Sequence, residues 1–254
     1  MTELRIGIDI GKRHDPSAIV VAMADLRTVD GKNTTHYTVP FLKRIKLETP
    51  YPDQVEELTE ICRGAVKRFN ESGRSSFMKQ PRIFVDVTGV GDAVVDLLEP
   101  NLKNVGILHP CRLAGGDQLN HSNNGRDFRI GKSHFVSRLQ VLAESKALHL
   151  PEQLPEAKQL SQEMLDFDID VDEQSGKATY GAIRPGTHDD MVTAIGLACL
   201  LEAEPDQGPL VFTGATKRSI NSTTGSGQNW FAEAAQHHGG ASSTLVGGIN
   251  HRSQ

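Results

Sequence analysis

The sequence has few of the features that mark secreted, membrane-spanning or disulfide-rich proteins. Its 254 residues include three cysteines, Cys62, Cys111 and Cys199, which lie far apart and form no CxxC pair. This spacing argues against a disulfide framework or a zinc ribbon, and it favours a reducing compartment. The longest apolar stretch, Met191–Leu201, is too short to span a bilayer, and the N-terminus has no signal-peptide pattern. We therefore expect a cytoplasmic protein with no membrane association and with three buried thiols.

Net charge is also modest, and it is negative. The formal charge is -5 at pH 7, with 23% charged and 37% hydrophobic residues. This is the composition of an ordinary globular protein, without the overall basic character of an autonomous DNA-binding domain. The acidic balance does not exclude nucleic acid as a substrate, because an enzyme that holds divalent cations on carboxylates is locally acidic.

The composition changes near residue 204. The segment 205–254 is rich in Gly, Ser, Thr, Asn, Gln and His, and it has few apolar residues beyond Trp230, Phe231, Leu245, Val246 and Ile249. So little apolar surface cannot offset the entropy lost on ordering the chain. We predict one domain over residues 1–204, followed by a flexible Gly/Ser-rich tail over residues 205–254.

Residues 1–204 have the pattern of a mixed α/β domain. The expected strands cover Leu4–Ile10, Ser17–Ala24, about His36–Lys46, Arg82–Val87, Val105–Leu108 and Lys177–Ile183. The expected helices cover Asp53–Phe69, a segment after Gly91 that ends at Pro100, Ser133–Leu148, Pro155–Phe167 and His188–Glu202. A long Gly/Asn-rich loop is expected over Ala114–Gly131. Three antiparallel strands followed by helix-linked strands suit an RNase H-like mixed sheet flanked by helices.

Acidic residues occur at three places where a charge is unusual or well placed for chemistry. Asp9 lies within the apolar strand sequence GIDIG, Asp86 lies within FVDVTG, and Asp189 and Asp190 open the last helix. A charge in an apolar strand is costly unless it is paired or metal-bound. Neighbouring strands could place Asp9 and Asp86 side by side, and divalent cations would relieve the repulsion between their carboxylates. Oxygen ligands of this kind favour Mg²⁺ or Mn²⁺.

Each of these residues also has a purely structural interpretation. Asp9 could be a turn or interface acid, Asp86 could cap the helix that follows, and Asp189 is an ordinary N-cap residue. His188 could donate to a phosphate, orient a carboxylate, bind metal or make a structural hydrogen bond. The hypothesis of a metal site therefore depends on the whole acidic set rather than on one residue.

Three motifs occur in a fixed order along the chain. They are Gly7-Ile8-Asp9-Ile10-Gly11 with Asp15-Pro16-Ser17-Ala18, then Val85-Asp86-Val87-Thr88-Gly89-Val90-Gly91, and finally Gly186-Thr187-His188-Asp189-Asp190. Together with Lys132, Leu148–Pro151 and Leu160–Phe167, this set resembles the nuclease domain of phage terminase large subunits over about residues 4–204. GIDIG alone is less specific, since sugar kinases and actin-like ATPases use it too.

The resemblance implies an endonuclease that cuts double-stranded DNA with two Mg²⁺ or Mn²⁺ ions about 3.5–4 Å apart, as terminases do on concatemeric phage DNA during packaging. By position, Asp9, Asp86 and Asp190 would bind the metals and Asp189 would assist, although the sequence leaves open which acid of the adjacent pair is the metal ligand. The implied partners are a packaging ATPase domain or subunit, a small terminase and a portal, in a host bacterial cytoplasm. Terminase large subunits place their ATPase before the nuclease, but no GxxxxGK[ST] motif occurs here. We therefore expect no ATP hydrolysis from this chain.

Basic residues near the predicted site are candidates for DNA contacts. Lys12 follows the first strand, Lys43, Arg44 and Lys46 flank the third, and Arg126, Arg129, Lys132 and Arg138 lie in or after the long loop. We expect Lys12, Arg126, Arg129 and Lys132 to contact phosphates, which positions a duplex without reading its sequence; a solvated charged surface is the alternative. Three other functions stay open: a RuvC-type Holliday-junction resolvase, a sugar kinase or actin-like ATPase, and a non-catalytic docking module of the packaging motor.

Overall fold

The structure, a computed structural model, describes residues 2–11, 15–29, 31–74, 79–122, 124–151, 153–171, 178–182 and 188–203. Lys12 and the tail predicted over residues 205–254 lie outside these ranges. No helix within them is long and apolar enough to cross a bilayer. Cys62, Cys111 and Cys199 are buried free thiols, as their spacing predicted.

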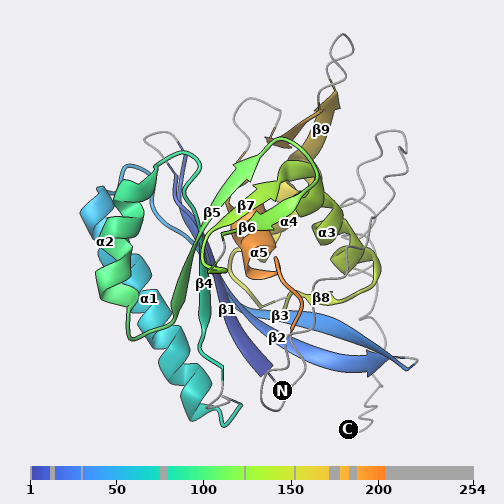
Figure 1. Cartoon of the computed structure of the whole chain (residues 1–254), viewed down its shortest axis with the longest axis horizontal. Helices are drawn as coiled ribbons and strands as arrows, with labels where there is room; N and C mark the ends of the chain where they lie inside the picture. The colour runs from blue at the N-terminus through green and yellow to red at the C-terminus, as the bar shows by residue number, and fades with distance from the viewer. Residues whose placement is uncertain are drawn as a thin grey trace, which may run out of the picture.

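One mixed sheet of eight strands forms the centre of the molecule (Figure 1). The strands are β1 (Thr2–Asp9), β2 (Ala18–Val29), β3 (Lys32–Arg44), β4 (Arg82–Asp86), β5 (Ile107–Ala114), β6 (Leu119–His121), β7 (Phe128–Gly131) and β8 (Leu148–His149). Their order across the sheet is β6-β7-β5-β4-β1-β2-β3-β8. Strands β1, β2 and β3 form an antiparallel meander, and β4 and β5 run parallel to β1. This arrangement confirms the predicted order of strands.

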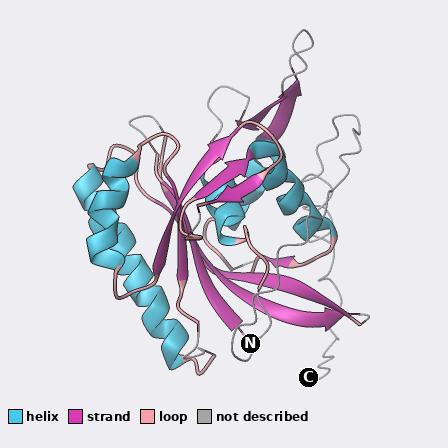
Figure 2. Cartoon of the chain, in the orientation of Figure 1, coloured by secondary structure: helices cyan, strands magenta, loops and turns pink. Residues whose placement is uncertain are grey.

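Helices cover both faces of the sheet (Figure 2). On one face lie α1 (Tyr51–Glu71) and α2 (Asp92–Leu102); on the other lie α3 (Lys132–Glu144), α4 (Ala157–Asp166) and α5 (Asp190–Ala198). Each face has its own buried apolar cluster, because side chains alternate between the two faces along every strand. A separate pair, β9 (Phe167–Val171) and β10 (Ala178–Ala182), is antiparallel, and β10 confirms the strand predicted over residues 177–183.

Sheet and helix approach each other closely at Gly7 of β1. A Cβ built on Gly7 would lie 2.0 Å from the carbonyl oxygen of Ala194 in α5, so no side chain fits between the two backbones. Helix α5 runs antiparallel to β1, because the Arg5 side chain reaches the carbonyl of Leu201 beyond the C-terminal end of the helix. The N-terminus of α5 therefore lies beside the end of β1, where Asp9 is.

The segment 114–131, predicted to be a loop, contains a β-hairpin instead. Strands β6 and β7 pair antiparallel, and β7 also pairs with β5, so the hairpin extends the main sheet. Phe128 and Ile130 are buried while Arg129 is exposed, which is the alternation of a one-sided strand. Gly125 adopts a φ of 68° in the turn, a conformation that glycine allows at little cost. This glycine therefore belongs to a hairpin turn and not to a long irregular loop.

Two predicted helix ends are also wrong. Helix α2 continues past Pro100 to Leu102, because a proline removes only one backbone donor so close to the end of the helix. Helix α3 ends at Glu144 rather than Leu148. There Lys146 adopts a φ of 54° and Ala147 N–H donates to the Leu142 carbonyl at 2.9 Å, which is a Schellman motif built on lysine instead of glycine. Strand β8 begins two residues after Lys146, at Leu148.

Candidate active site

Two of the predicted acids meet at the ends of adjacent strands. Asp9 is the last residue of β1 and Asp86 is the last residue of β4, and the two are direct partners in the parallel register. Their neighbours Ile8 and Val85 point into the cluster under α1 and α2. Because side chains alternate, Asp9 and Asp86 face the opposite side, which α5 covers. The expectation that these two carboxylates lie side by side is confirmed.

The third pair of acids reaches the same place from α5. Asp189 is the N-cap residue of this helix and Asp190 its first residue. Asp190 is buried, with 3% of its surface exposed, whereas Asp189 is partly exposed. Within the described residues the Asp189 side chain makes no capping hydrogen bond, so the alternative role as an ordinary N-cap is not what the structure shows.

The acids perturb one another electrostatically. Burial raises the pKa of Asp9 well above its ordinary value, and the negative charges of Asp86, Asp190, Asp189 and Asp15 raise it further. Burial also raises the pKa of Asp86. These shifts have the cause expected for like charges that converge in a partly desolvated place, which is typical of functional sites.

Asp86 is oriented by a short hydrogen-bonded turn. The backbone N–H of Thr88 donates to Asp86 Oδ1 at 2.8 Å, and the Thr88 hydroxyl donates to the same oxygen. The Thr88 hydroxyl oxygen in turn accepts the N–H of Leu113 at 2.8 Å, which connects the end of β4 to β5. Helix α2 begins only at Asp92. The Asp86 carboxylate therefore closes a turn beside Asp9 and does not cap the helix that follows.

An arginine that sequence reasoning grouped with surface cations holds the N-terminus of α5. Arg44, at the end of β3, donates from Nε to Asp190 Oδ2 at 2.9 Å and from a terminal nitrogen to Oδ1 at 3.2 Å. This is the bidentate geometry of a strong arginine–carboxylate pair. Arg44 also forms an ion pair with Glu163 of α4, and Glu163 Oε2 accepts the N–H of Met191 at 3.0 Å. Glu163 therefore supplies the cap that Asp189 does not.

The sequence did contain a signal for Glu163. Its neighbours in the helical pattern, Leu160, Met164 and Phe167, are apolar and pack in or against the buried cluster. A carboxylate on such a stripe needs a partner. The partner, Arg44, lies more than 100 residues away in the sequence, so no local pattern could name it.

Among the predicted basic residues, Lys132 lies close to the acids. Lys132 begins α3 and, with Asp189 and Thr193, lines a small cavity of about 30 Å³. Its positive charge offsets part of the effect of burial on the pKa of Asp86. Arg126 forms an ion pair with Glu99 of α2 at 2.8 Å.

The remaining predicted site residues are placed as follows. Arg129 is exposed on β7, where its register partner in β5 is Arg112. His188 is partly buried directly before Asp189. Burial raises the pKa of Asp190, and the charges of Arg44 and, less strongly, His188 oppose that shift. Lys12 lies outside the described residues.

Comparisons with known proteins found no match in sequence and structural likenesses of low TM-score. No protein-family model and no curated protein matches the sequence. Among solved structures, the Mn-soaked nuclease domain of human cytomegalovirus terminase is 12% identical, with a TM-score of 0.41, over 77% of this chain and 80% of that one. A second structure of that domain is 10% identical, with a TM-score of 0.38, over 77% and 81%. Thermus thermophilus RuvC is 10% identical, with a TM-score of 0.36, over 78% and 91%.

The strand order decides the fold class. An antiparallel β1–β2–β3 meander, with β4 and β5 added parallel to β1 and helices on both faces, is the arrangement predicted from the sequence. The fold is RNase H-like. In this RNase H-like domain the acids lie at the ends of the two central strands, β1 and β4, and at the start of the helix that crosses them.

At this end of the RNase H-like sheet, two of the three predicted ligands are placed to bind a hard divalent cation and the third is not. Asp9 and Asp86 offer adjacent carboxylates whose repulsion a cation would relieve. However, no group of three or more His, Cys, Asp or Glu side chains in the described ranges is arranged to hold a metal ion. The Asp190 carboxylate is bound by Arg44, so the third ligand of the predicted set is engaged elsewhere.

Proposed function

We propose that this chain is a metal-dependent endonuclease that hydrolyses phosphodiester bonds in double-stranded DNA, in the manner of terminase nuclease domains that cut concatemeric phage DNA during packaging. The observation that carries the proposal is the direct register pairing of Asp9 with Asp86 next to the acidic N-terminus of α5. Such a cluster of carboxylates is costly unless cations occupy it, which gives the arrangement a purpose beyond stability.

In this proposal Asp9 and Asp86 are the principal ligands of Mg²⁺ or Mn²⁺. Asp189 is the favoured third ligand, because it is partly exposed and its charge acts on both Asp9 and Asp86. Asp190 then positions the start of α5 through its pair with Arg44. In this proposal Asp189 is the metal ligand and Asp190 assists, the reverse of what the resemblance implies. When bound, two such ions supply an activated water and stabilise the leaving 3′ oxygen.

The chain's own cations would position the DNA. Lys132 lies beside Asp86 and Asp189, where its ammonium group would hold the phosphate that is to be cut. Arg129 is exposed on β7 but alternates with Phe128 and Ile130, which lie on the side of the sheet that carries the acids, so it points to the other face and is a weaker candidate for a phosphate contact. Arg126 contributes less, because it is already paired with Glu99. A packaging ATPase, a small terminase and a portal are the proposed protein partners.

The test is cleavage of supercoiled plasmid by the purified chain with Mn²⁺, with Mg²⁺ and with EDTA. We expect metal-dependent nicking and linearisation that is lost in Asp9→Ala, by a factor on the order of 10³. The matched control is Asp96→Asn, an exposed acid on α2, which should cut like the wild type. A folded protein that neither cleaves nor binds Mn²⁺ would contradict the proposal and favour a docking module of the packaging motor.

The same assay separates the two nuclease functions. A terminase-type enzyme should cut linear duplex and a four-way junction at similar rates, whereas a resolvase should strongly prefer the junction. Asp189→Asn and Asp190→Asn, compared by Mn²⁺ titration, locate the third ligand: the proposal expects the larger loss of metal affinity in Asp189→Asn.

A further inference from the structure

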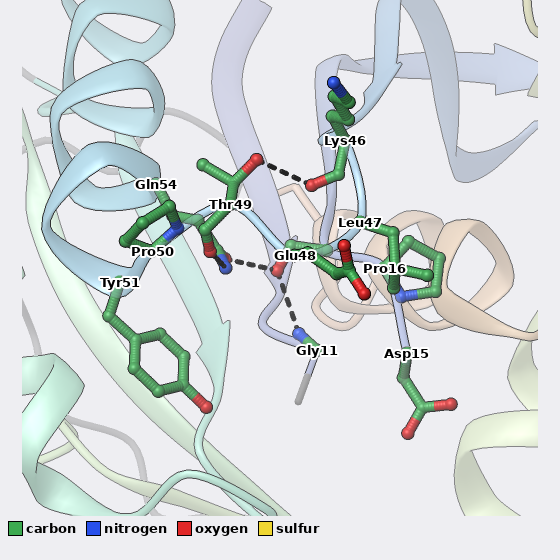
Figure 3. A pocket seen from close by; sticks show the side chains of 11 residues that line it. Gly11, Asp15, Pro16, Lys46, Leu47, Glu48, Thr49, Pro50, Tyr51 and Gln54 are labelled. Atoms are coloured by element: carbon green, nitrogen blue, oxygen red, sulfur yellow. Dashed lines mark hydrogen bonds between the residues drawn. The ribbon is translucent and has the colours of Figure 1, made fainter. Parts of the chain in front are cut away.

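A cavity of about 420 Å³ lies just beyond the acidic pair, and nothing in the proposed cleavage step uses it. Its floor includes Gly11, which follows Asp9 by two residues and so lies within about 7 Å of it along the chain. One wall comes from Asp15 and Pro16, and the other comes from residues 46–51 and the first turn of α1 (Figure 3). A molecule held at Asp9 and Asp86 could therefore extend into this cavity.

The cavity is held together by a chain of hydrogen bonds. The N–H of Gly11 donates to Ser17 Oγ at 2.9 Å, and the Ser17 hydroxyl donates to Gln54 Oε1 at 2.7 Å. Gln54 Nε2 then donates to the carbonyl of Thr49 at 2.6 Å. Ser17 is 3% exposed, so the link between the floor and the far wall is buried. Walls joined in this way are preorganised for a ligand.

Two large apolar side chains on the far wall are exposed to solvent. Leu47 is 42% exposed and Tyr51 is 39% exposed. Between them Glu48 adopts a φ of 65°, a left-handed conformation that is unfavourable for a residue with a side chain. Exposed apolar groups next to a strained backbone position and a polar site indicate binding rather than stability.

The chemistry of the lining favours a flat, uncharged and partly polar ligand. Asp15 and Glu48 outnumber Lys46, so the cavity as a whole does not suit a phosphate. Figure 3 shows Tyr51 and Asp15 on opposite sides of Gly11, with the Lys46 ammonium group directed away from both. An aromatic ring, apolar prolines and carboxylate acceptors together match a heteroaromatic ring with N–H groups at its edge.

We infer that this cavity binds a nucleobase of the DNA strand whose phosphate lies at Asp9 and Asp86, stacked on Tyr51. The inference rests on the proposed function, because DNA must occupy the acidic site. A base that is paired within a duplex cannot enter a cavity, so the bound base is unpaired. The preferred substrate is therefore a duplex with an unpaired nucleotide beside the bond to be cut.

The experiment measures base binding without cleavage. A duplex carrying one unpaired 2-aminopurine is titrated with the protein in Ca²⁺, a cation that carboxylates bind and that replaces Mg²⁺ or Mn²⁺ so that the strand is held without being cut. The fluorescence of the probe reports stacking. We expect quenching with the wild type and with Tyr51→Phe, which keeps the ring, and a dissociation constant raised roughly 10-fold or more in Tyr51→Ala. Leu97→Ala, which truncates another exposed apolar residue on α2, is the matched control and should bind like the wild type.

Equal binding by wild type and Tyr51→Ala, or equal quenching of paired and unpaired probes, would overturn the inference. Since Ca²⁺ replaces the ion used for cleavage, binding of the base and cleavage of the plasmid are measured separately. A protein that cleaves plasmid but does not quench the probe refutes the cavity and keeps the nuclease. A protein that quenches the probe but never cleaves refutes the nuclease and leaves a DNA-binding site. Thermal melting of each variant verifies that it is folded.

Discussion

At the C-terminal end of helix α5 two arginines, the buried Arg5 and the partly buried Arg138, are paired with oxygen atoms, whereas at the N-terminal end Asp189 and Asp190 lie near Asp9 and add to its negative surroundings. At the C-terminal end Arg138 donates to the Cys199 carbonyl and pairs with Glu202 at 2.7 Å, and Tyr37 donates to the Leu201 carbonyl. At the N-terminal end burial and mutual repulsion raise the pKa of Asp9. Both ends agree with the helix dipole, yet only the N-terminal end lies beside carboxylates whose charges repel one another.

The contrast shows how one helix can carry both fold and chemistry. The C-terminal network fixes the position of α5 against β1 and β3, and Gly7 lets the backbones touch. That fixed position is what makes a costly acidic cluster sustainable at the other end. Substitutions at the two ends should therefore change stability by different amounts and in different directions.

The largest change in stability is expected from Arg5, which is fully buried. Its side chain donates to the carbonyls of Leu201 and Glu202 at 2.8 and 3.0 Å, and it pairs with Glu3 at 2.6 Å. Arg5→Met should lower the free energy of unfolding by about 4 kcal/mol, because it leaves a buried carboxylate with one partner fewer. Chemical denaturation measures the change. A loss no larger than that of the exposed Arg63→Met would contradict the role given to Arg5.

Removal of Arg44 should have the next largest effect. Arg44→Met leaves both Asp190 and Glu163 buried without their cation, and we expect a loss of about 3 kcal/mol in the free energy of unfolding. The adjacent Lys43 pairs with Glu57 where both side chains are partly exposed, so Lys43→Met should cost no more than about 0.5 kcal/mol. Similar losses for Arg44 and Lys43 would show that the arginine does not hold α5.

The smallest effect has the opposite sign. The folded-state pKa of Asp9 lies well above the ordinary value of 3.8, so the folded protein holds the Asp9 proton more tightly than the unfolded chain does. Protonated Asp9 therefore stabilises the protein fully below about pH 3.8. This contribution is lost as pH rises through the folded-state pKa. In EDTA, Asp9→Asn should therefore be more stable than the wild type at neutral pH by at least about 1 kcal/mol. The difference should shrink on acidification, as thermal melting across pH would show. A less stable Asp9→Asn protein at pH 7 would contradict the electrostatic account.

The sequence predicted the centre of the fold well because the centre depends on local patterns. Alternation through Leu4–Ile10 and Arg82–Val87 located β1 and β4, and their order in the sheet followed from the meander and the helical connection. Asp9 and Asp86 could be paired in advance because each ends a strand, and parallel neighbours end at the same edge. No local pattern predicted the hairpin in residues 114–131, because glycines and asparagines at this density are typical of a loop.

The parts of the site that could not be predicted depend on contacts far apart in the chain. Arg44 has the same local pattern as Lys43, yet only Arg44 faces Asp190, and the difference is set by the alternation of β3 against a helix nearly 150 residues later. The cavity next to Gly11 likewise joins two segments that no spacing rule connects. The lysine-based end of α3 was missed because such motifs usually use glycine.

The close backbone contact at Gly7 should keep the acidic cluster in place when the surrounding core changes. Where a helix packs on a sheet through side chains, a substitution in the core shifts the helix slightly, and the residues at the end of the helix move with it. Here the separation of α5 from β1 is set by backbone atoms alone, so the surrounding apolar residues can diverge while the spacing between Asp9 and the start of α5 stays the same. Distant sequences could thus share this geometry with almost no identity in their cores.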